Sequence, residues 1–382
     1  EIEIHSSSDL KYSFPAIDAI YEAKDGISLV HSNQRVFENF QDIKNNESIN
    51  KTQTGFDIYL DDEKESFITA INGPVLVKNK ELNIDFFNFK GDKIREKIKY
   101  KKINPYQSFF IELKNFKKLK KFLKNQRGFC KFNLPTENIF NRILAGTISR
   151  NRKKITTTHS YYDCSDSRDY IKTKNIDKKE YQCYLPFNLI EGLDLEIVIY
   201  PIFSRTNLKI SLETYDSDFK RRTIKDDLII INKNFKDPKI INLSKIINQK
   251  NKKDRNNVYC LNIVSNDNKL PSRLTFGFNY KKTSMGSNIS ESMIVNHGKD
   301  IKGRGFYWGP AFCSKNIKTI IALSSVSKSK DEVMSKPKLI KMNLYGQEKI
   351  ILSKKFYIKS PQALNLDIKK YLKSKKISNN EA

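Results

Sequence analysis

One short stretch of the sequence concentrates side chains that can do chemistry. It comprises His159, Tyr161, Tyr162 and Asp163, with Cys164 directly after them. An imidazole, a carboxylate and a thiol this close together could coordinate a metal ion, or the His and the Asp could orient a nucleophile. The same group of polar and aromatic side chains could also contact an organic ligand.

A structural role for His159 competes with these possibilities. His31 and His297 also end apolar, strand-like runs, but they lack the Asp and Cys neighbours. A His that recurs at strand ends is typical of a residue that hydrogen-bonds the loop after it. We therefore expect no catalytic residue and no metal site here, and we keep the segment as a conditional ligand-binding site.

A second segment, residues 298–310, carries the only Trp of the chain and four of its 14 Gly. Its side chains of interest are Arg304, Tyr307 and Trp308. Flat rings beside a cation could stack on a sugar ring or a base. The alternative is a Gly-hinged loop that buries Trp308 beneath its own domain, since Trp is usually well buried. If the chain binds a ligand through specific chemistry, we expect the ligand at one of these two segments.

Familiar catalytic motifs do not occur in this sequence. It contains no GxSxG, HExxH, P-loop or kinase pattern, and no CxxC pair for zinc or redox chemistry. The Gly303–Gly305 spacing does not match a dinucleotide fingerprint. We therefore expect no cofactor and favour a non-enzymatic protein. An enzyme that acts on a glycan through a site near His159 is the alternative.

The elements that must position these segments form an internal repeat. A hairpin pattern of alternating apolar residues, a terminal aromatic residue and a polar turn occurs three times, ending at Phe89, Tyr215 and Tyr345. These aromatic residues lie about 130 residues apart, which is the size of a whole domain. Cys130 and Cys260 lie one period apart in similar strands, so we expect them to superpose.

The repeat predicts three tandem domains, covering residues 1–136, 137–268 and 269–382. We expect the third to lack its last strand and therefore to be truncated. Turn signals at short intervals and the lack of long helical periodicity indicate an all-β fold of antiparallel β-sandwiches, Ig-like or jelly-roll-like. Apolar residues at helical spacing in residues 115–124 predict a short capping helix, and residues near 246 and 371 fill the same slot.

The composition sets further limits. The net charge of +27 fits a nucleic-acid or polyanion binder, but the basic residues are dispersed, and an AT-rich coding sequence also enriches Lys, Asn and Ile. Five Cys leave open whether Cys164 and Cys183 pair. No window approaches 18 apolar residues and no leader is visible, so we expect a soluble chain without a transmembrane segment. Its compartment and oligomeric state stay open.

Together these observations favour a non-catalytic binding or structural module of repeated β-sandwiches, contacting a carbohydrate or a surface assembly. The expected partners are a glycan or another protein, and nucleic acid is the less favoured partner. The argument is that whole domains are duplicated while no polar cluster is duplicated with them.

Overall fold

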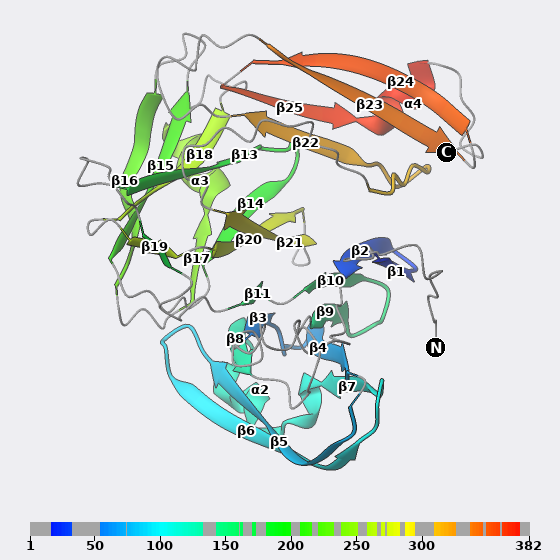
Figure 1. Cartoon of the computed structure of the whole chain (residues 1–382), viewed down its shortest axis with the longest axis vertical. Helices are drawn as coiled ribbons and strands as arrows, with labels where there is room; N and C mark the ends of the chain where they lie inside the picture. Colours follow the sequence, from blue (N-terminus) through cyan, green and yellow to red (C-terminus); the bar gives the residue numbers. More distant parts are fainter. Residues whose placement is uncertain are drawn as a thin grey trace.

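The computed structural model describes residues 17–32, 54–73, 75–132, 143–159, 161–162, 170–172, 181–199, 207–215, 221–232, 238–250, 258–265, 269–271, 273–282, 287–294, 309–325, 337–346, 349–359 and 361–374. As predicted, these residues form an all-β protein of several antiparallel sheets with short helices (Figure 1). Within this described part, no helix combines the length and the apolar character that a membrane span requires.

Two sheets make up what we call the first sandwich. One holds β11 (Tyr161–Tyr162), β3 (Thr54–Ile58), β8 (Gly128–Phe132), β5 (Val77–Phe87) and β6 (Lys93–Ile103), in that order. The other holds β10 (Ile155–His159), β9 (Leu144–Ser149), β4 (Lys64–Ile71) and β7 (Ser108–Glu112). A 3-10 turn (Leu113–Asn115) and helix α2 (Lys117–Leu123) join β7 to β8.

The second sandwich repeats this plan. One sheet holds β13 (Tyr181–Phe187), β18 (Val258–Ser265), β15 (Leu208–Tyr215) and β16 (Arg221–Ile231). The other holds β17 (Lys239–Asn242), β14 (Asp194–Ile199), β20 (Arg273–Lys281) and β21 (Ser287–Ile294), and helix α3 (Leu243–Lys250) follows β17. Strands β13 to β18, β20 and β21 therefore take the places of β3 to β10, in the same chain order. Strands β12 (Tyr170–Lys172) and β19 (Lys269–Pro271) form a separate small sheet.

The remaining elements lie at the two ends of the described chain. Strands β1 (Ile17–Ala23) and β2 (Gly26–Ser32) form an N-terminal hairpin. The C-terminal strands are two antiparallel pairs, β22 (Ile320–Ser325) with β25 (Gln362–Asp367), and β23 (Lys338–Gly346) with β24 (Lys349–Ile358). Helix α4 (Ile368–Ser374) follows β25, just as α3 follows β17. In Figure 1 the C-terminal strands lie at the top, the second sandwich at the left and the first at the bottom.

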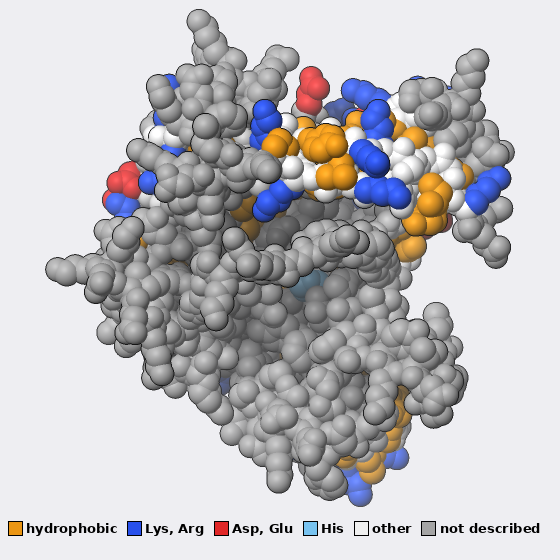
Figure 2. All heavy atoms as spheres, turned by 45° about the horizontal axis from the view of Figure 1, so that its top comes forward, with side chains coloured by type: hydrophobic (Ala, Val, Ile, Leu, Met, Phe, Trp, Pro, Cys, Tyr) orange, Lys and Arg blue, Asp and Glu red, His pale blue; other side chains and the backbone are white. Residues whose placement is uncertain are grey.

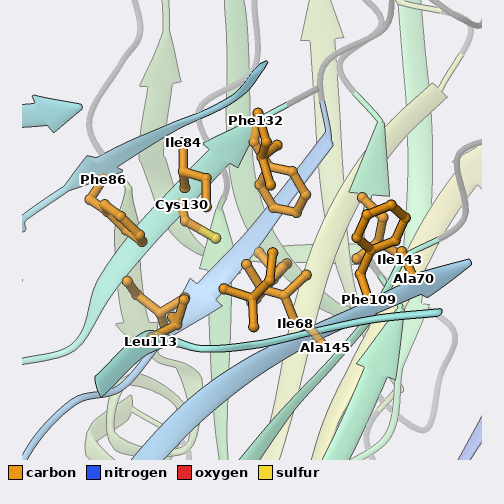
Figure 3. Close-up of a cluster of buried hydrophobic side chains, with 14 of the residues drawn as sticks. Ile68, Ala70, Ile84, Phe86, Phe109, Leu113, Cys130, Phe132, Ile143 and Ala145 are labelled. Carbon is orange, nitrogen blue, oxygen red and sulfur yellow. The ribbon is translucent and has the colours of Figure 1, made fainter. Parts of the chain in front are cut away.

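Period-two alternation produces the core of the first sandwich. Along β5, Leu82, Ile84 and Phe86 are fully buried, and the residues between them are only partly buried. Figure 3 shows Phe86 from one sheet and Ile68 from the other within this cluster. A fully buried side chain of this kind contributes about 1.5–3 kcal/mol. Burial between the two sheets is therefore what holds the sandwich together.

The hairpins and helices predicted from the sequence are confirmed. Strand pairs β5–β6, β15–β16 and β23–β24 are the three predicted hairpins, and α2, α3 and α4 fill the predicted helical slot. In the first hairpin, however, β5 ends at Phe87, and the predicted terminal aromatic Phe89 lies in the turn. Strand β9 pairs with β4, and β10 pairs with β9, so this sheet spans the predicted boundary after residue 136. Strand β20 pairs with β14 across the boundary after residue 268. The division into three domains stays a prediction.

The expected superposition of Cys130 on Cys260 is wrong. Cys130 faces the core of the first sandwich, where it packs with Phe86. Cys260 faces away from its own core and packs with Tyr215 and Val258. Because successive side chains of a strand point to opposite faces, an offset of one residue is enough to exchange core for surface.

A prediction follows from the close pairing of β3 with β8. A Cβ atom at Gly55 would lie 2.3 Å from the carbonyl oxygen of Cys130. We expect Gly55→Ala to force the two strands apart and to lower stability by about 1–3 kcal/mol. Gly26→Ala is the control, because a Cβ there meets nothing within 4 Å. Hydrogen exchange of residues 128–132 at increasing urea concentration measures the stability of both variants. Equal urea midpoints for the two variants would contradict the expectation.

Candidate functional site

The sequence-predicted site is only partly covered by the described residues. His159 ends β10, pairs with Leu144 and is half-buried. Tyr161 and Tyr162 form β11 and pair with β3, so the chain passes from one sheet of the sandwich to the other between His159 and Tyr161. The side chains of Tyr161 and Tyr162, and all of Asp163, Arg304, Tyr307 and Trp308, lie outside the described residues. Ligand binding at these positions stays a prediction.

The structure instead brings polar side chains together where the two sandwiches meet, a contact we call the first junction. A cavity of about 360 Å³ lies there. The first sandwich lines it with side chains that include Asp57, Lys64 and Arg127, and the second contributes Glu196 and Lys281. Thr156, Thr157 and Thr158 of β10, which precede His159, form part of the wall.

Arg127 is the centre of this group. Its Nε and Nη2 donate to Oδ2 of Asp57, at 2.9 and 2.5 Å, and its Nη1 donates to Oε2 of Glu196, at 3.4 Å. Only 9% of the Arg127 side chain and 5% of the Asp57 side chain are exposed. Glu196 also accepts from Nζ of Lys281. One guanidinium thus ties a carboxylate of the first sandwich to a carboxylate of the second.

The aromatic ring of Tyr59 lies against two cations of this group, Arg127 and Lys64. The guanidinium carbon of Arg127 lies 4.9 Å from the centre of the Tyr59 ring, and Nζ of Lys64 lies 4.2 Å from it. Both distances fall within the range of cation–π attraction. Burial raises the pKa of the Tyr59 phenol. Burial also lowers the pKa of Lys64, so the cavity disfavours the charge of this Lys.

The electrostatics of Arg127 show why the arrangement holds together. Burial by itself would lower the pKa of Arg127, but the Asp57 carboxylate, Tyr59 and Glu196 together raise it. The guanidinium is therefore held in its charged state, and each of the two carboxylates accepts from it. We call this group the charged lock of the first junction. It joins the two sandwiches, and breaking it would leave buried charge without its partner.

Apolar contact accompanies the lock at the first junction. Phe129 of β8 and Val198 of β14 are both fully buried, although each faces away from its own core. Phe87, the cross-strand neighbour of Phe129, and Ile240, the cross-strand neighbour of Val198, complete the cluster. Two facing pairs of residues, one from each sandwich, therefore form the apolar contact.

A second junction joins the second sandwich to the C-terminal strands. The side-chain nitrogen of Asn188 lies 3.1 Å from the carbonyl oxygen of Leu323, 3.0 Å from that of Leu364 and 2.8 Å from Oδ1 of Asn365. Asn365 returns a hydrogen bond to the carbonyl oxygen of Leu189, at 2.7 Å. Here too an apolar group accompanies the polar one, since Tyr215, Val258 and Cys260 pack with Ala363 of β25.

The described part contains no cluster of three or more His, Cys, Asp or Glu suited to a metal ion. Its free cysteines are Cys130 and Cys260, which are buried, and Cys313, which is half-buried. Burial raises the pKa of both the Cys130 and the Cys260 thiol. These two thiols therefore have little thiolate character at neutral pH.

Sequence reasoning missed the residues of both junctions. Neither Arg127 nor Asp57 belongs to a motif that the sequence singles out, although Asp57 stands between the apolar Phe56 and Ile58. One signal was available, because an acidic residue inside an apolar strand run usually requires a buried cationic partner. The local sequence around Asn188 contains no pattern that predicts its hydrogen bonds to the C-terminal strands.

A prediction tests the lock at the first junction. Arg127→Ala leaves Asp57 buried without its guanidinium, and we expect a loss of about 3–5 kcal/mol in the free energy of unfolding. Lys120→Ala is the control, because Lys120 and Asp62 form an ion pair whose side chains are 51% and 73% exposed. Solvent screens an exposed pair, so we expect only a small loss for this variant. Urea unfolding measures both, and similar small losses for the two variants would count against a structural lock.

Comparisons with known proteins complete the description. No family model and no curated protein matches the chain. One similar solved structure is the C-terminal domain of the Streptococcus pyogenes antigen I/II-family protein AspA, with 11% identity and a TM-score of 0.17, covering 74% of our chain and 100% of that chain. Another is the BSP domain of a biofilm-associated protein, with 9% identity, a TM-score of 0.19 and coverages of 77% and 62%. Likenesses this low leave the functional argument to the junctions themselves.

Proposed function

We propose that the chain is a non-catalytic structural module in which duplicated β-sandwiches are joined in series at fixed orientations. The observation that carries this proposal is the reuse of one contact. In each of the two sandwiches, the same outer face packs against the strands that follow in the chain. The first sandwich packs against β14 and β17, and the second packs against β25, which pairs with β22 as β17 pairs with β14. A contact repeated at one structural position is what duplication of a domain together with its junction would produce.

We call one side of this contact the donor side and the other the acceptor side; the names do not refer to hydrogen bonds. The donor side is the end of the hairpin beside β8 or β18. In the first sandwich it is the cross-strand pair Phe87 and Phe129, whose ring centres lie 6.2 Å apart. In the second it is the cross-strand pair Tyr215 and Val258. Phe87 and Tyr215 are the last residues of β5 and β15, so the two pairs occupy matching positions.

The acceptor side is the pair of strands before the short helix. The first junction uses Val198 and Ile240, which are directly opposed on β14 and β17. The second junction uses Ala363 of β25, which is directly opposed to Ser324 of β22. Ile240 and Ala363 each lie three residues before a buried Leu where the strand gives way to the short helix, Leu243 and Leu366. The acceptor positions therefore also match.

Polar groups make each junction specific in orientation. Apolar contact alone is not directional, whereas the Arg127 ion pairs and the Asn188 hydrogen bonds require defined geometry. A module of this kind would serve as a spacer or scaffold that holds other surfaces apart in fixed orientations. The loops that follow the recurrent His strands, including residues 159–163, remain the proposed place for contact with a glycan or another protein.

The rigidity of the second junction can be tested through Cys260. Its thiol is buried against the C-terminal strands, so labelling requires the junction to open. Removing the Asn188 hydrogen bonds should lower the cost of opening. We expect Asn188→Ala to raise the labelling rate of Cys260 about tenfold. Mass spectrometry of the labelled peptides measures this rate. The rate of Cys130, inside the core of the first sandwich, should not change.

Asn72→Ala is the matched control. The Asn72 side chain also donates to two carbonyl oxygens, those of Val75 and Asn104, but all three residues belong to the first sandwich. This variant should leave the Cys260 rate as it is in the unmodified protein. Equal Cys260 rates in the Asn188→Ala variant and the unmodified protein, or equal acceleration by both variants, would rule out a junction that is held shut by Asn188.

A further inference from the structure

We propose that copies of this chain associate head to tail, with the C-terminal strands of one copy docking on the first sandwich of the next through Tyr345 and Phe110. The proposal goes beyond a rigid module, because such a module could remain a monomer. It follows from tracing the acceptor and donor positions of the two junctions through the whole described chain.

The acceptor position occurs three times. Phe110 of β7 lies three residues before the buried Leu113, as Ile240 and Ala363 lie before their buried Leu residues. Phe110 is directly opposed to Thr69 of β4. Ile240 and Ala363 are covered by the preceding sandwich, whereas the Phe110 side chain is 64% exposed. The first sandwich thus presents the acceptor face without a sandwich upon it.

The donor position also occurs three times. Tyr345, next to the end of β23, corresponds to Phe87 and Tyr215 at the ends of β5 and β15. Tyr215 is 5% exposed because the C-terminal strands cover it, whereas Tyr345 is 61% exposed. Its hairpin partner Ile350, at the place of Lys93 and Arg221, is 49% exposed. Among the described residues no strand takes the place of β8 or β18 beside β23, so the C-terminal strands present the aromatic residue of the donor pair without an acceptor against it.

The surfaces around the two aromatic residues suit a contact between copies. Phe110 stacks on Phe67, with ring centres 5.3 Å apart, and a hollow of about 250 Å³ lies beside them. Figure 2 looks onto the C-terminal strands and shows hydrophobic side chains gathered there among Lys and Arg. The exposed large hydrophobic residues of β23 and β24 are Leu339, Tyr345, Ile350 and Tyr357. Exposed apolar groups of this kind mark interaction surfaces.

Sheet order points in the same direction. In both sandwiches a hairpin, β9–β10 or β20–β21, extends the sheet beyond β4 or β14. Among the described residues, the corresponding strand β22 pairs with β25 alone. The hairpin β1–β2 packs on β10 as β10 packs on β21, with Ser28 Oγ 2.8 Å from Thr157 Oγ1. The β1–β2 hairpin of a second copy would therefore lie beside β22 as β20–β21 lies beside β14, while the first sandwich of that second copy receives Tyr345.

An uncovered donor residue and an uncovered acceptor residue on the same described chain are the condition for a heterologous, head-to-tail contact. Such a contact produces chains of copies unless the rotation between copies closes a ring. The net charge of +27 opposes association at low salt. Because added salt screens this repulsion and leaves apolar contact intact, association should strengthen as salt rises. Association mediated by a bound polyanion would weaken instead.

The test uses the full chain and two complementary variants, Phe110→Ser and Tyr345→Ser. Sedimentation velocity over a range of protein concentrations at about 0.3 M salt should show species larger than dimers for the unmodified chain. We expect each variant alone to associate about 30-fold more weakly, because each lacks one buried interface aromatic. An equimolar mixture should form a dimer and stop there, since Phe110→Ser keeps the donor and Tyr345→Ser keeps the acceptor.

Tyr357→Ser is the control, because Tyr357 is 64% exposed on the same hairpin but lies opposite Leu339, at the far end from Tyr345. It should assemble as the unmodified chain does, and circular dichroism should show all three variants folded. A monomer at every concentration would overturn the proposal, as would assembly that persists in both single variants or in their mixture beyond the dimer. None of these results bears on the Cys260 labelling test, so the rigid module and the assembly stand or fall separately.

Discussion

The whole arrangement depends on strands that are apolar on both faces. A strand in a two-layer sandwich needs apolar side chains on its inner face only, and a solvated outer face is normally polar. Strand β8 instead buries Cys130 inward and Phe129 outward, and β18 buries Tyr259 inward and Cys260 outward. The outward residue is removed from water only when a second protein surface covers it, which favours contact with a neighbour. The first and second sandwiches therefore each come with a preference for a neighbour built into one strand.

Burial of these outer faces explains cohesion, but it does not explain orientation. Apolar surfaces tolerate sliding and rotation, because the free energy follows the buried area. Arg127 removes this freedom at the first junction, since its fork must meet Asp57 and Glu196 together. Asn188 does the same at the second junction through uncharged hydrogen bonds. The two junctions thus share their apolar position and differ in their polar lock, which allows each to set its own angle.

Local patterns in the sequence were sufficient for the elements, and they failed where partners are distant. The β5–β6, β15–β16 and β23–β24 hairpins and the helices follow from periodicity within about 25 residues. The pairing of β9 with β4 and the meeting of Arg127 with Glu196 depend on contacts between segments about 70 to 80 residues apart. The face of Cys260 was missed for another reason: β18 is apolar at nearly every position, so alternation cannot reveal which side faces the core.

The side-chain volumes at the two junctions also indicate that the two contacts are equivalent. At the first junction the acceptor residues Val198 and Ile240 are bulky, and the fully buried donor is the single ring of Phe129, with Phe87 half-buried beside it. At the second junction the acceptor is small, Ala363 opposite Ser324, and three buried donors fill the space, Tyr215, Val258 and Cys260. Protein interiors are close-packed, so a smaller group on one side must be matched by larger ones on the other. The two junctions thus fill the same structural position with opposite distributions of side-chain volume.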